Sequence, residues 1–186
     1  MTPDEAYEEA LRRIREAEET GAVKLDLSGI KDWKNWKTAV PEFTELAVLT
    51  WLPPELARLT SLQSLNLSHC YWLSDMSPLA SLTNLQALNL SFCGQLSGDL
   101  SPLASLTSLQ WLDLNGCIEL RKFTPLEPLL PQLQELRLFN CRFDDLPSEV
   151  CGQDLSDNVI REVRAHFADL RSGRSIDARI KNFHPG

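Results

Sequence analysis

Four segments of the chain repeat one pattern of leucines at a nearly constant interval. The segments are LQSLNLSHC at 62–70, LQALNLSFC at 85–93, LQWLDLNGC at 109–117 and LQELRLFNC at 133–141. In the central Leu-x-Leu, alternate side chains of an extended strand point the same way, so both leucines face inward and the residue between them faces out. One such strand is too short to enclose a core. The copies are therefore expected to stack as parallel neighbours about 4.8 Å apart and to join their leucines into one core.

The interval between the copies indicates the kind of repeat. The middle leucines, Leu65, Leu88, Leu112 and Leu136, are 23, 24 and 24 residues apart. The pattern Leu-x-x-Leu-x-Leu-x-x-Cys resembles the leucine-rich repeat, whose period is about 20–29 residues. The return segments SPLASL and TPLEPL resemble those of bacterial internalin-type repeats, and their prolines favour short or irregular helical turns. The resemblance implies an α/β fold: a short, right-handed horseshoe of leucine-rich repeats with a parallel β-sheet on its concave face.

Both ends of the chain are expected to form helical caps, because a solenoid must shield its terminal leucines from water. Residues 1–22 form the first cap. Thr2 to Glu5 reads as a capping box with proline at the first helical position, and Gly21 marks the end of a helix over 3–20. Its inward face carries apolar side chains at helical spacing. They are Tyr7, Ala10, Leu11, Ile14 and Ala17.

Residues 151–186 are expected to form the second cap, in which a loop with Ser156, Asp157 and Asn158 leads into a helix. Its apolar stripe is expected to cover Leu136 and Leu138, and Gly173 marks its end. The stripe consists of Val159, Val163, Phe167 and Leu170. The tail after residue 173 reads either as a strand or as a frayed end.

The repeats occupy residues 23–150, and their first period is irregular. The segment VKLDLSG at 23–29 fits the strand pattern with Leu25 and Leu27 inward, but 40 residues separate Leu25 from Leu65. An insertion at about 30–48, with Trp33 and Trp36, breaks the register. The pattern does not decide whether residues 46–51 form a full strand.

The composition limits the location and the ligands of the protein. A net charge of -8 and a pI of about 4.9 disfavour binding to nucleic acids and to anionic membranes. The N-terminal segment lacks the apolar stretch of a secretory signal, and no stretch approaches the roughly 18 apolar residues of a membrane span. Since five cysteines occur without an export signal, we expect free thiols and a cytoplasmic protein.

The whole chain is similar to the repeat region of bacterial Roco proteins. The similarity rests on ALRRIREAEETGAVKLDLSG at 10–29, on the repeats, and above all on LPSEVCG at 146–152 followed by NVIREVRAHFADLRSG at 158–173. In that family a Ras-like GTP-binding domain follows the repeats. The phosphate-binding motif G-x-x-x-x-G-K-[ST] does not occur in this sequence, so nucleotide binding is not expected. The resemblance implies a repeat module that senses partners, or a regulatory fragment of such a GTPase.

Neither the cysteines nor the histidines indicate catalysis. The four repeat cysteines are expected to be buried, reduced and free of metal, because zinc sites prefer close pairs such as C-x-x-C. They are Cys70, Cys93, Cys117 and Cys141. His69 next to Ser68 reads as a polar surface pair, and no known hydrolase motif accompanies it. We expect no cofactor and no enzyme activity, with a hydrolase as the distant alternative.

The outward positions of the last repeats carry the candidate binding residues. Aromatic side chains beside charges of both signs, on a rigid sheet, are typical of protein interfaces. We therefore expect a protein partner, of unknown identity, on the concave face. The candidate partner-binding residues are Phe92, Trp111, Asp113, Glu135, Arg137 and Phe139.

Overall fold

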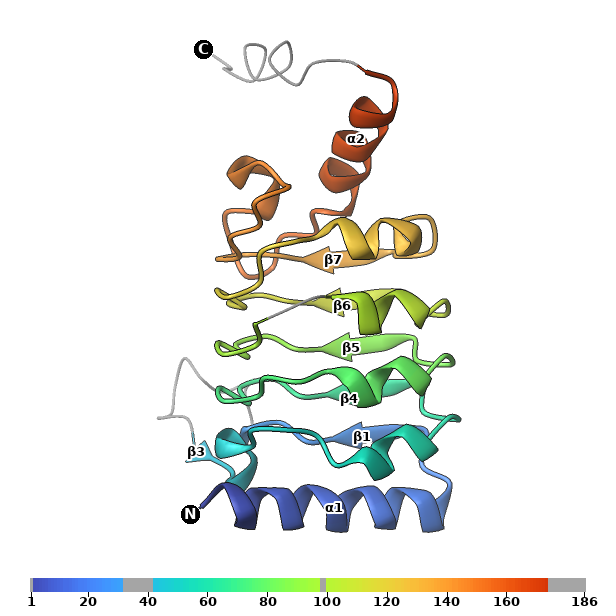
Figure 1. Cartoon of the computed structure of the whole chain (residues 1–186), viewed down its shortest axis with the longest axis vertical. Coiled ribbons are helices and arrows are strands. Elements are labelled where there is room, and N and C mark those ends of the chain that lie inside the picture. The colour runs from blue at the N-terminus through green and yellow to red at the C-terminus, as the bar shows by residue number, and fades with distance from the viewer. Residues whose placement is uncertain (1, 32–41, 98–99, 174–186) are drawn as a thin grey trace.

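The repeats stack into one parallel sheet. The computed structural model describes residues 2–31, 42–97 and 100–173. Five strands lie in the order β1-β4-β5-β6-β7, with a helix at each end of the stack (Figure 1). The strands are β1 (Lys24–Asp26), β4 (Ser64–Asn66), β5 (Ala87–Asn89), β6 (Trp111–Asp113) and β7 (Glu135–Arg137). The fold class expected from the leucine pattern is confirmed.

The register of the sheet places equivalent leucines side by side. Leu25 pairs with Leu65, Leu65 with Leu88, Leu88 with Leu112, and Leu112 with Leu136. The last four are at most 1% exposed, while Leu25 at the end of the sheet is half-buried. A second buried row lies two residues further along each repeat, as strand alternation requires. This row consists of Leu27, Leu67, Leu90, Leu114 and Leu138.

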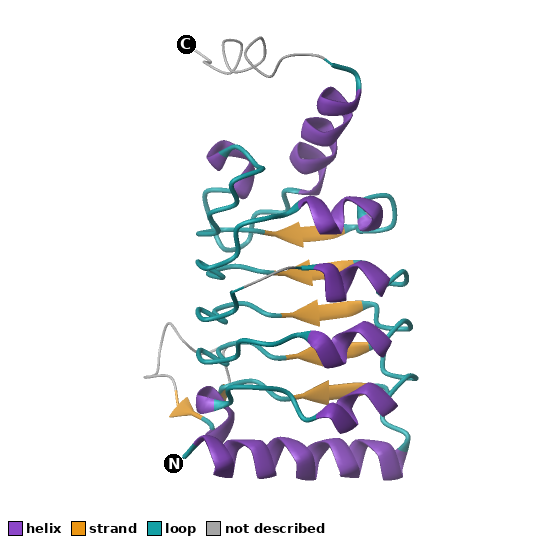
Figure 2. Ribbon diagram, in the orientation of Figure 1, coloured by secondary structure: helices purple, strands orange, loops and turns teal. Residues whose placement is uncertain are grey.

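Short 3₁₀ helices return the chain from one strand to the next. The four that lie between Pro54 and Leu129 stack on one another in front of the strands (Figure 2). In the SPLASL and TPLEPL segments a proline stands at the start of the helix. Its missing N–H costs nothing there, because the first N–H groups of a helix have no partner within the helix. The helices are η2 (Glu45–Val48), η3 (Pro54–Arg58), η4 (Ser77–Ser81), η5 (Ser101–Ser105), η6 (Thr124–Leu129) and η7 (Ser148–Cys151).

The irregular first period contains a small hairpin. Strands β2 (Ile30–Lys31) and β3 (Glu42–Phe43) pair in antiparallel fashion, and Trp33 and Trp36 lie outside the described residues. Residues 46–51 do not form a full strand: they enter η2 and then make a single bridge from Trp51 to Asp75. The tail 174–186, whose structure the sequence left open, also lies outside the described residues.

Helix α1 (Pro3–Thr20) closes the N-terminal end as expected. The amide of Glu5 donates to Thr2 Oγ1, the amide of Thr2 donates to Glu5 Oε2, and Gly21 ends the helix in the left-handed conformation. The capping box and the glycine stop are thus confirmed. The buried side chains of the helix are Ala6, Ala10, Leu11, Ile14 and Ala17. Tyr7 is only partly buried.

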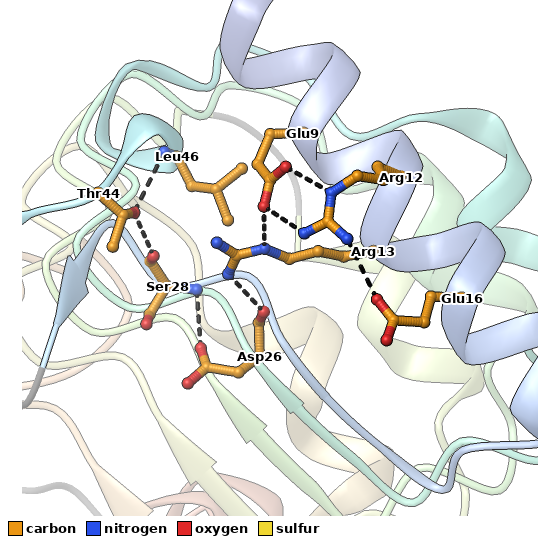
Figure 3. A network of polar contacts seen from close by, with 8 residues as sticks. All are labelled: Glu9, Arg12, Arg13, Glu16, Asp26, Ser28, Thr44 and Leu46. Atoms are coloured by element: carbon orange, nitrogen blue, oxygen red, sulfur yellow. Dashed lines mark hydrogen bonds and ion pairs between the residues drawn. The ribbon is translucent and has the colours of Figure 1, made fainter.

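A polar network ties α1 to the first strand (Figure 3). Arg13 Nε donates to Glu9 Oε1 at 2.6 Å, and its Nη1 donates to the backbone oxygen of Asp26 at 3.2 Å. Further along, Thr44 Oγ1 donates to the backbone oxygen of Ser28. The backbone oxygens of Asp26 in β1 and of Ser28 just after it therefore find partners in α1 and in the segment after the hairpin.

Helix α2 (Ile160–Arg171) closes the other end, with one correction to the expected stripe. Val159, Val163 and Phe167 are buried, as expected, but Leu170 is 50% exposed. Ile160, which the stripe did not include, is buried instead. In Figure 1 the C-terminal turns of α2 point away from β7, so a residue late in the helix no longer reaches the repeats.

The outer edge of β7 is completed by the residues that precede α2. Asn158 Oδ1 accepts from the amide of Leu136, and its Nδ2 donates to the backbone oxygen of Gln134. The amide of Val159 donates to the backbone oxygen of Leu136. These bonds replace those that a sixth strand would make, so they close an edge that would otherwise offer backbone groups to other chains.

The repeat cysteines form a hydrogen-bonded ladder inside the solenoid. All four are at most 8% exposed. Each thiol lies 3.0–3.2 Å from a backbone oxygen of the preceding repeat, which gives this small side chain a polar partner as well as an apolar slot. Burial raises the pKa of Cys70 and of Cys117 to about 12, which disfavours the reactive thiolate. Their expected burial is confirmed.

Candidate functional site

The outward positions of the sheet form two columns that run across all five strands. Most of their side chains are half-buried, so part of each side chain remains accessible to solvent. The first column holds Lys24, Ser64, Ala87, Trp111 and Glu135, and the second holds Asp26, Asn66, Asn89, Asp113 and Arg137. The register confirms that Trp111 neighbours Glu135 and that Asp113 neighbours Arg137.

Four of the six candidate residues form one cluster. The Arg137 guanidinium lies over the Trp111 ring, with Cζ 5.6 Å from the ring centroid. Its Nη2 lies 2.5 Å from Glu135 Oε1, and its Nη1 lies 3.9 Å from Asp113 Oδ2. We call the cluster of Trp111, Asp113, Glu135 and Arg137 the Trp111 patch. Contacts within the chain thus hold the Trp111 indole, the Arg137 guanidinium and the Glu135 carboxylate in one geometry, before any partner protein binds.

Asp113 differs from its expected role because it is almost buried. It is 6% exposed, and its Oδ1 accepts from the amide of Asn115 at 2.9 Å. The preceding column members make the same side-chain turn: Asp26 to Ser28, Asn66 to Ser68 and Asn89 to Ser91. Asp113 therefore helps to end its strand and is not a freely exposed contact residue.

Burial also changes the acidity of Asp113. Desolvation raises its pKa to about 6, although the amide of Asn115 and the nearby Arg137 act in the opposite direction. Glu135 adds a further small upward effect as a like charge. The amide of Asn115 and the guanidinium of Arg137 thus compensate the negative charge of Asp113 only in part.

The residue that follows the second inward leucine is also buried in three of the repeats. Ser68, Ser91 and Asn115 are 2–7% exposed. Asn115 Nδ2 donates to the backbone oxygen of Leu155 at 2.8 Å, so segment 152–158 lies against the carboxyl end of β6. Asn115 Oδ1 also accepts from the amide of Phe139, which has no side-chain turn of its own because Arg137 stands where Asp or Asn stands elsewhere.

Phe92 and Phe139 do not join the Trp111 patch. Phe92 stacks on His69, with ring centroids 4.8 Å apart, and His69 Nδ1 lies 3.0 Å from Tyr71 Oη. Burial lowers the pKa of His69, which favours its neutral form. Phe139 is half-buried, and in the described part of the chain no ring contact joins it to another aromatic side chain. His69 is thus one member of an aromatic stack, and its ring nitrogen contacts the hydroxyl of Tyr71.

The turns that follow strands β4 to β7 were not foreseen from the sequence. His69, Phe92, Gly116 and Asn140, each directly before a repeat cysteine, have φ values of 59–71°. This left-handed conformation favours glycine and asparagine and is uncommon for histidine and phenylalanine. Gly116 and Asn140 in that column were the available signal, because residues that tolerate positive φ recurred at one repeat position.

A polar cleft of about 610 Å³ lies at the amino ends of β5 to β7. Glutamine side chains dominate it, and Gln134 Nε2 donates to Gln110 Oε1 at 3.3 Å. Its one charged lining residue, Arg164, already donates to the backbone oxygens of Leu130, Pro131 and Leu133. Among the described residues no group of three or more His, Cys, Asp or Glu side chains could hold a metal ion, and no helix is long and apolar enough to cross a membrane.

Two family models match the repeats and settle the fold. Residues 60–105 match the model of Leucine Rich repeats in two copies, and residues 132–153 match the model of the Leucine Rich Repeat. The fold is a leucine-rich-repeat solenoid. The matched residues contain strands β4, β5 and β7 of the sheet, and β6 continues the same register.

Solved structures similar to this leucine-rich-repeat chain include two internalins from Listeria monocytogenes. One internalin is 32% identical over 57% of this chain, with a TM-score of 0.44. Internalin C2 is 26% identical over 69% of this chain, with a TM-score of 0.45. The alignments span 33% and 57% of those two chains. No protein with a curated description matches the sequence.

Proposed function

We propose that this leucine-rich-repeat solenoid is a protein-interaction module whose partner binds the sheet face at the Trp111 patch. The observation that carries the proposal is the half-buried indole of Trp111, fixed beneath Arg137 on an open sheet surface. Large aromatic side chains and arginine dominate the binding energy of protein interfaces. Because the strand backbone and the Arg137–Glu135 pair already hold these groups, little ordering is needed on binding.

Phe92 and Phe139 extend the proposed surface toward the carboxyl ends of the strands. Both are half-buried, and both belong to the edge where segment 152–158 also lies. The proposal thus keeps all six candidate residues but divides them: Trp111, Glu135 and Arg137 as contact residues, Asp113 as the charged floor beneath them, and the two phenylalanines at the rim.

The test is capture of partner proteins from a lysate of the source cell. Trp111→Ala is expected to weaken capture of specific proteins by about 2 kcal/mol or more, as for a buried aromatic anchor. Trp72→Ala is the matched control, because Trp72 is 57% exposed on a loop outside the patch. Equal capture by the wild type and the Trp111→Ala variant, with both folded, would contradict the proposal.

We further propose a regulatory role beside a Roco-type GTPase as the second candidate. The similarity of residues 146–152 and 158–173 to the repeat region of those proteins favours it, and the half-exposed Leu170 on α2 provides a side chain with which to test it. The test is to add the chain to an isolated Ras-like domain of such a protein and to measure GTP turnover. A rate that changes with the wild type but not with Leu170→Ser would support this role, and an unchanged rate would contradict it.

The proposal also covers the cellular compartment of the protein and the classes of ligand that it is not expected to bind. We assign the chain to the cytoplasm on the basis of its free thiols, and we assign it no catalysis, cofactor, nucleotide, nucleic acid or membrane partner. Equilibrium dialysis with labelled GTP is the simplest check. Saturable binding at micromolar concentrations would show that a nucleotide site exists.

A further inference from the structure

We propose that the partner presents an arginine side chain to the Trp111 patch; this inference rests on the proposed function. The patch already accommodates one guanidinium, that of Arg137, which lies on the indole face and pairs with Glu135. The groups that hold it are those by which proteins bind arginine: an aromatic face and carboxylates within reach of the fork of N–H donors.

The charges of the patch do not balance. Two carboxylates, Asp113 and Glu135, face one guanidinium, and Arg137 contacts them unequally: Nη2 lies 2.5 Å from Glu135 Oε1, whereas Nη1 lies 3.9 Å from Asp113 Oδ2. Asp113 Oδ2 is therefore beyond hydrogen-bond distance of the only basic group that pairs with it in the described chain. A second guanidinium would supply the missing positive charge.

Asp113 also stands where a neutral residue would fold equally well. Asn66 and Asn89 occupy the same column and make the same turn with their side-chain oxygens. The Asp113 side chain is only 8% exposed, so its charge carries a desolvation penalty that asparagine would avoid. The two preceding repeats use an amide at this position, so the buried carboxylate of Asp113 indicates a function for the charge, and the function that fits is attraction of a cation.

The surroundings strengthen the negative potential. Segment 152–158, which touches Asn115, contains Asp154 and Asp157 and no lysine or arginine. The chain as a whole carries a net charge of -8. A basic partner would be drawn to this surface and would associate faster at low salt.

The experiment uses the full chain and an arginine–glycine repeat peptide, with a glutamate–glycine peptide of equal length as the comparison. NMR titration follows the indole N–H signal of Trp111. The arginine peptide is expected to shift this signal and the glutamate peptide is not. Glu135→Gln is expected to weaken arginine-peptide binding by about tenfold, as loss of a charged interface contact does. Melting curves confirm that the variant is folded.

Glu19→Gln is the matched control, because it removes the same charge from the exposed side of α1. Weakening by Glu19→Gln equal to that by Glu135→Gln, or an arginine peptide that leaves the Trp111 signal unmoved, would overturn the inference. If lysate capture depends on Trp111 while the arginine peptide does not bind there, the inference fails and the proposed function stands. If neither depends on Trp111, both fail.

Discussion

We call the sheet surface over β4 and β5 the first half and that over β6 and β7 the second half; the two share a backbone and differ in the side chains that they present. Strands β4 and β5 display Ser64, Asn66, Ala87 and Asn89, all small or neutral, whereas β6 and β7 display the Trp111 patch. Beneath both surfaces lie the same buried leucines in the same register. The difference shows that the repeat specifies its fold through the inward positions and leaves the outward ones free to carry function.

The second half also receives the end of the chain. Segment 152–158 lies against Asn115, and Asn158 completes the edge of β7. In the described chain, the outward residues of β4 and β5 make their hydrogen bonds within the repeats. The proposed partner surface and the C-terminal cap therefore share the same two repeats.

Deleting residues 157–172 should have the largest effect, and should act on the second half first. The deletion removes Val159, Ile160, Val163 and Phe167, whose burial contributes roughly 6–12 kcal/mol before entropy. Domains of this size are stable by only about 5–15 kcal/mol, so cooperative unfolding should be lost or aggregation should follow. Light scattering and a thermal melt measure this. The control is Leu170→Ala, an exposed position that should shift stability by less than about 0.5 kcal/mol. A monomeric deletion variant with an unchanged melting temperature would disprove the cap.

The inward positions should show no difference between the halves. Leu88→Ala in β5 and Leu112→Ala in β6 each empty a fully buried site, so each should lower the free energy of unfolding by about 2–5 kcal/mol. Urea denaturation of the two variants provides the comparison. A large cost in one half and none in the other would mean that the repeats do not share one core.

The second outward column should respond oppositely in the two halves. The pKa of Asp113 is raised to about 6 in the folded chain, so the stability linked to this carboxyl is present at low pH and is lost as pH rises through about 6. Asp113→Asn should therefore gain stability over the wild type between pH 5 and pH 7, by up to about 3 kcal/mol. Asn89→Asp, the reciprocal change, should lose about 1 kcal/mol at pH 7. Denaturation at several pH values tests both, and a stability difference for Asp113→Asn that does not depend on pH would contradict the account.

The sequence was sufficient to predict the sheet, its register and both capping helices. Leucine spacing is a local signal, and each copy confirms the others, so Leu65 to Leu136 could be placed on one inward row. The capping box of Thr2 and Glu5 is also a local signal, and it located the start of α1. Leu170 was misplaced because helical periodicity gives the face of a residue but not the direction in which the helix leaves the repeats.

The site was predicted less completely, because its details depend on contacts between distant residues. The spacing placed Trp111 beside Glu135 and Asp113 beside Arg137, as the register confirms. It could not reveal that Asn115 meets Leu155, forty positions further along the chain, and so could not reveal the burial there. Nor could it show that Phe92 stacks on His69 instead of joining the patch.

The central claim, that folding depends on the inward residues and binding on the outward residues of β6 and β7, is tested most directly by one transplant. Trp111→Ala, Asp113→Asn, Glu135→Ser and Arg137→Asn together give β6 and β7 the outward residues of β5 and β4. We predict a cooperative melt at or above the wild-type temperature, because Asp113→Asn keeps the turn that Asn66 and Asn89 make and removes a buried charge. We also predict complete loss of partner capture. A variant that unfolds, or one that folds and still captures the same proteins, would contradict the account.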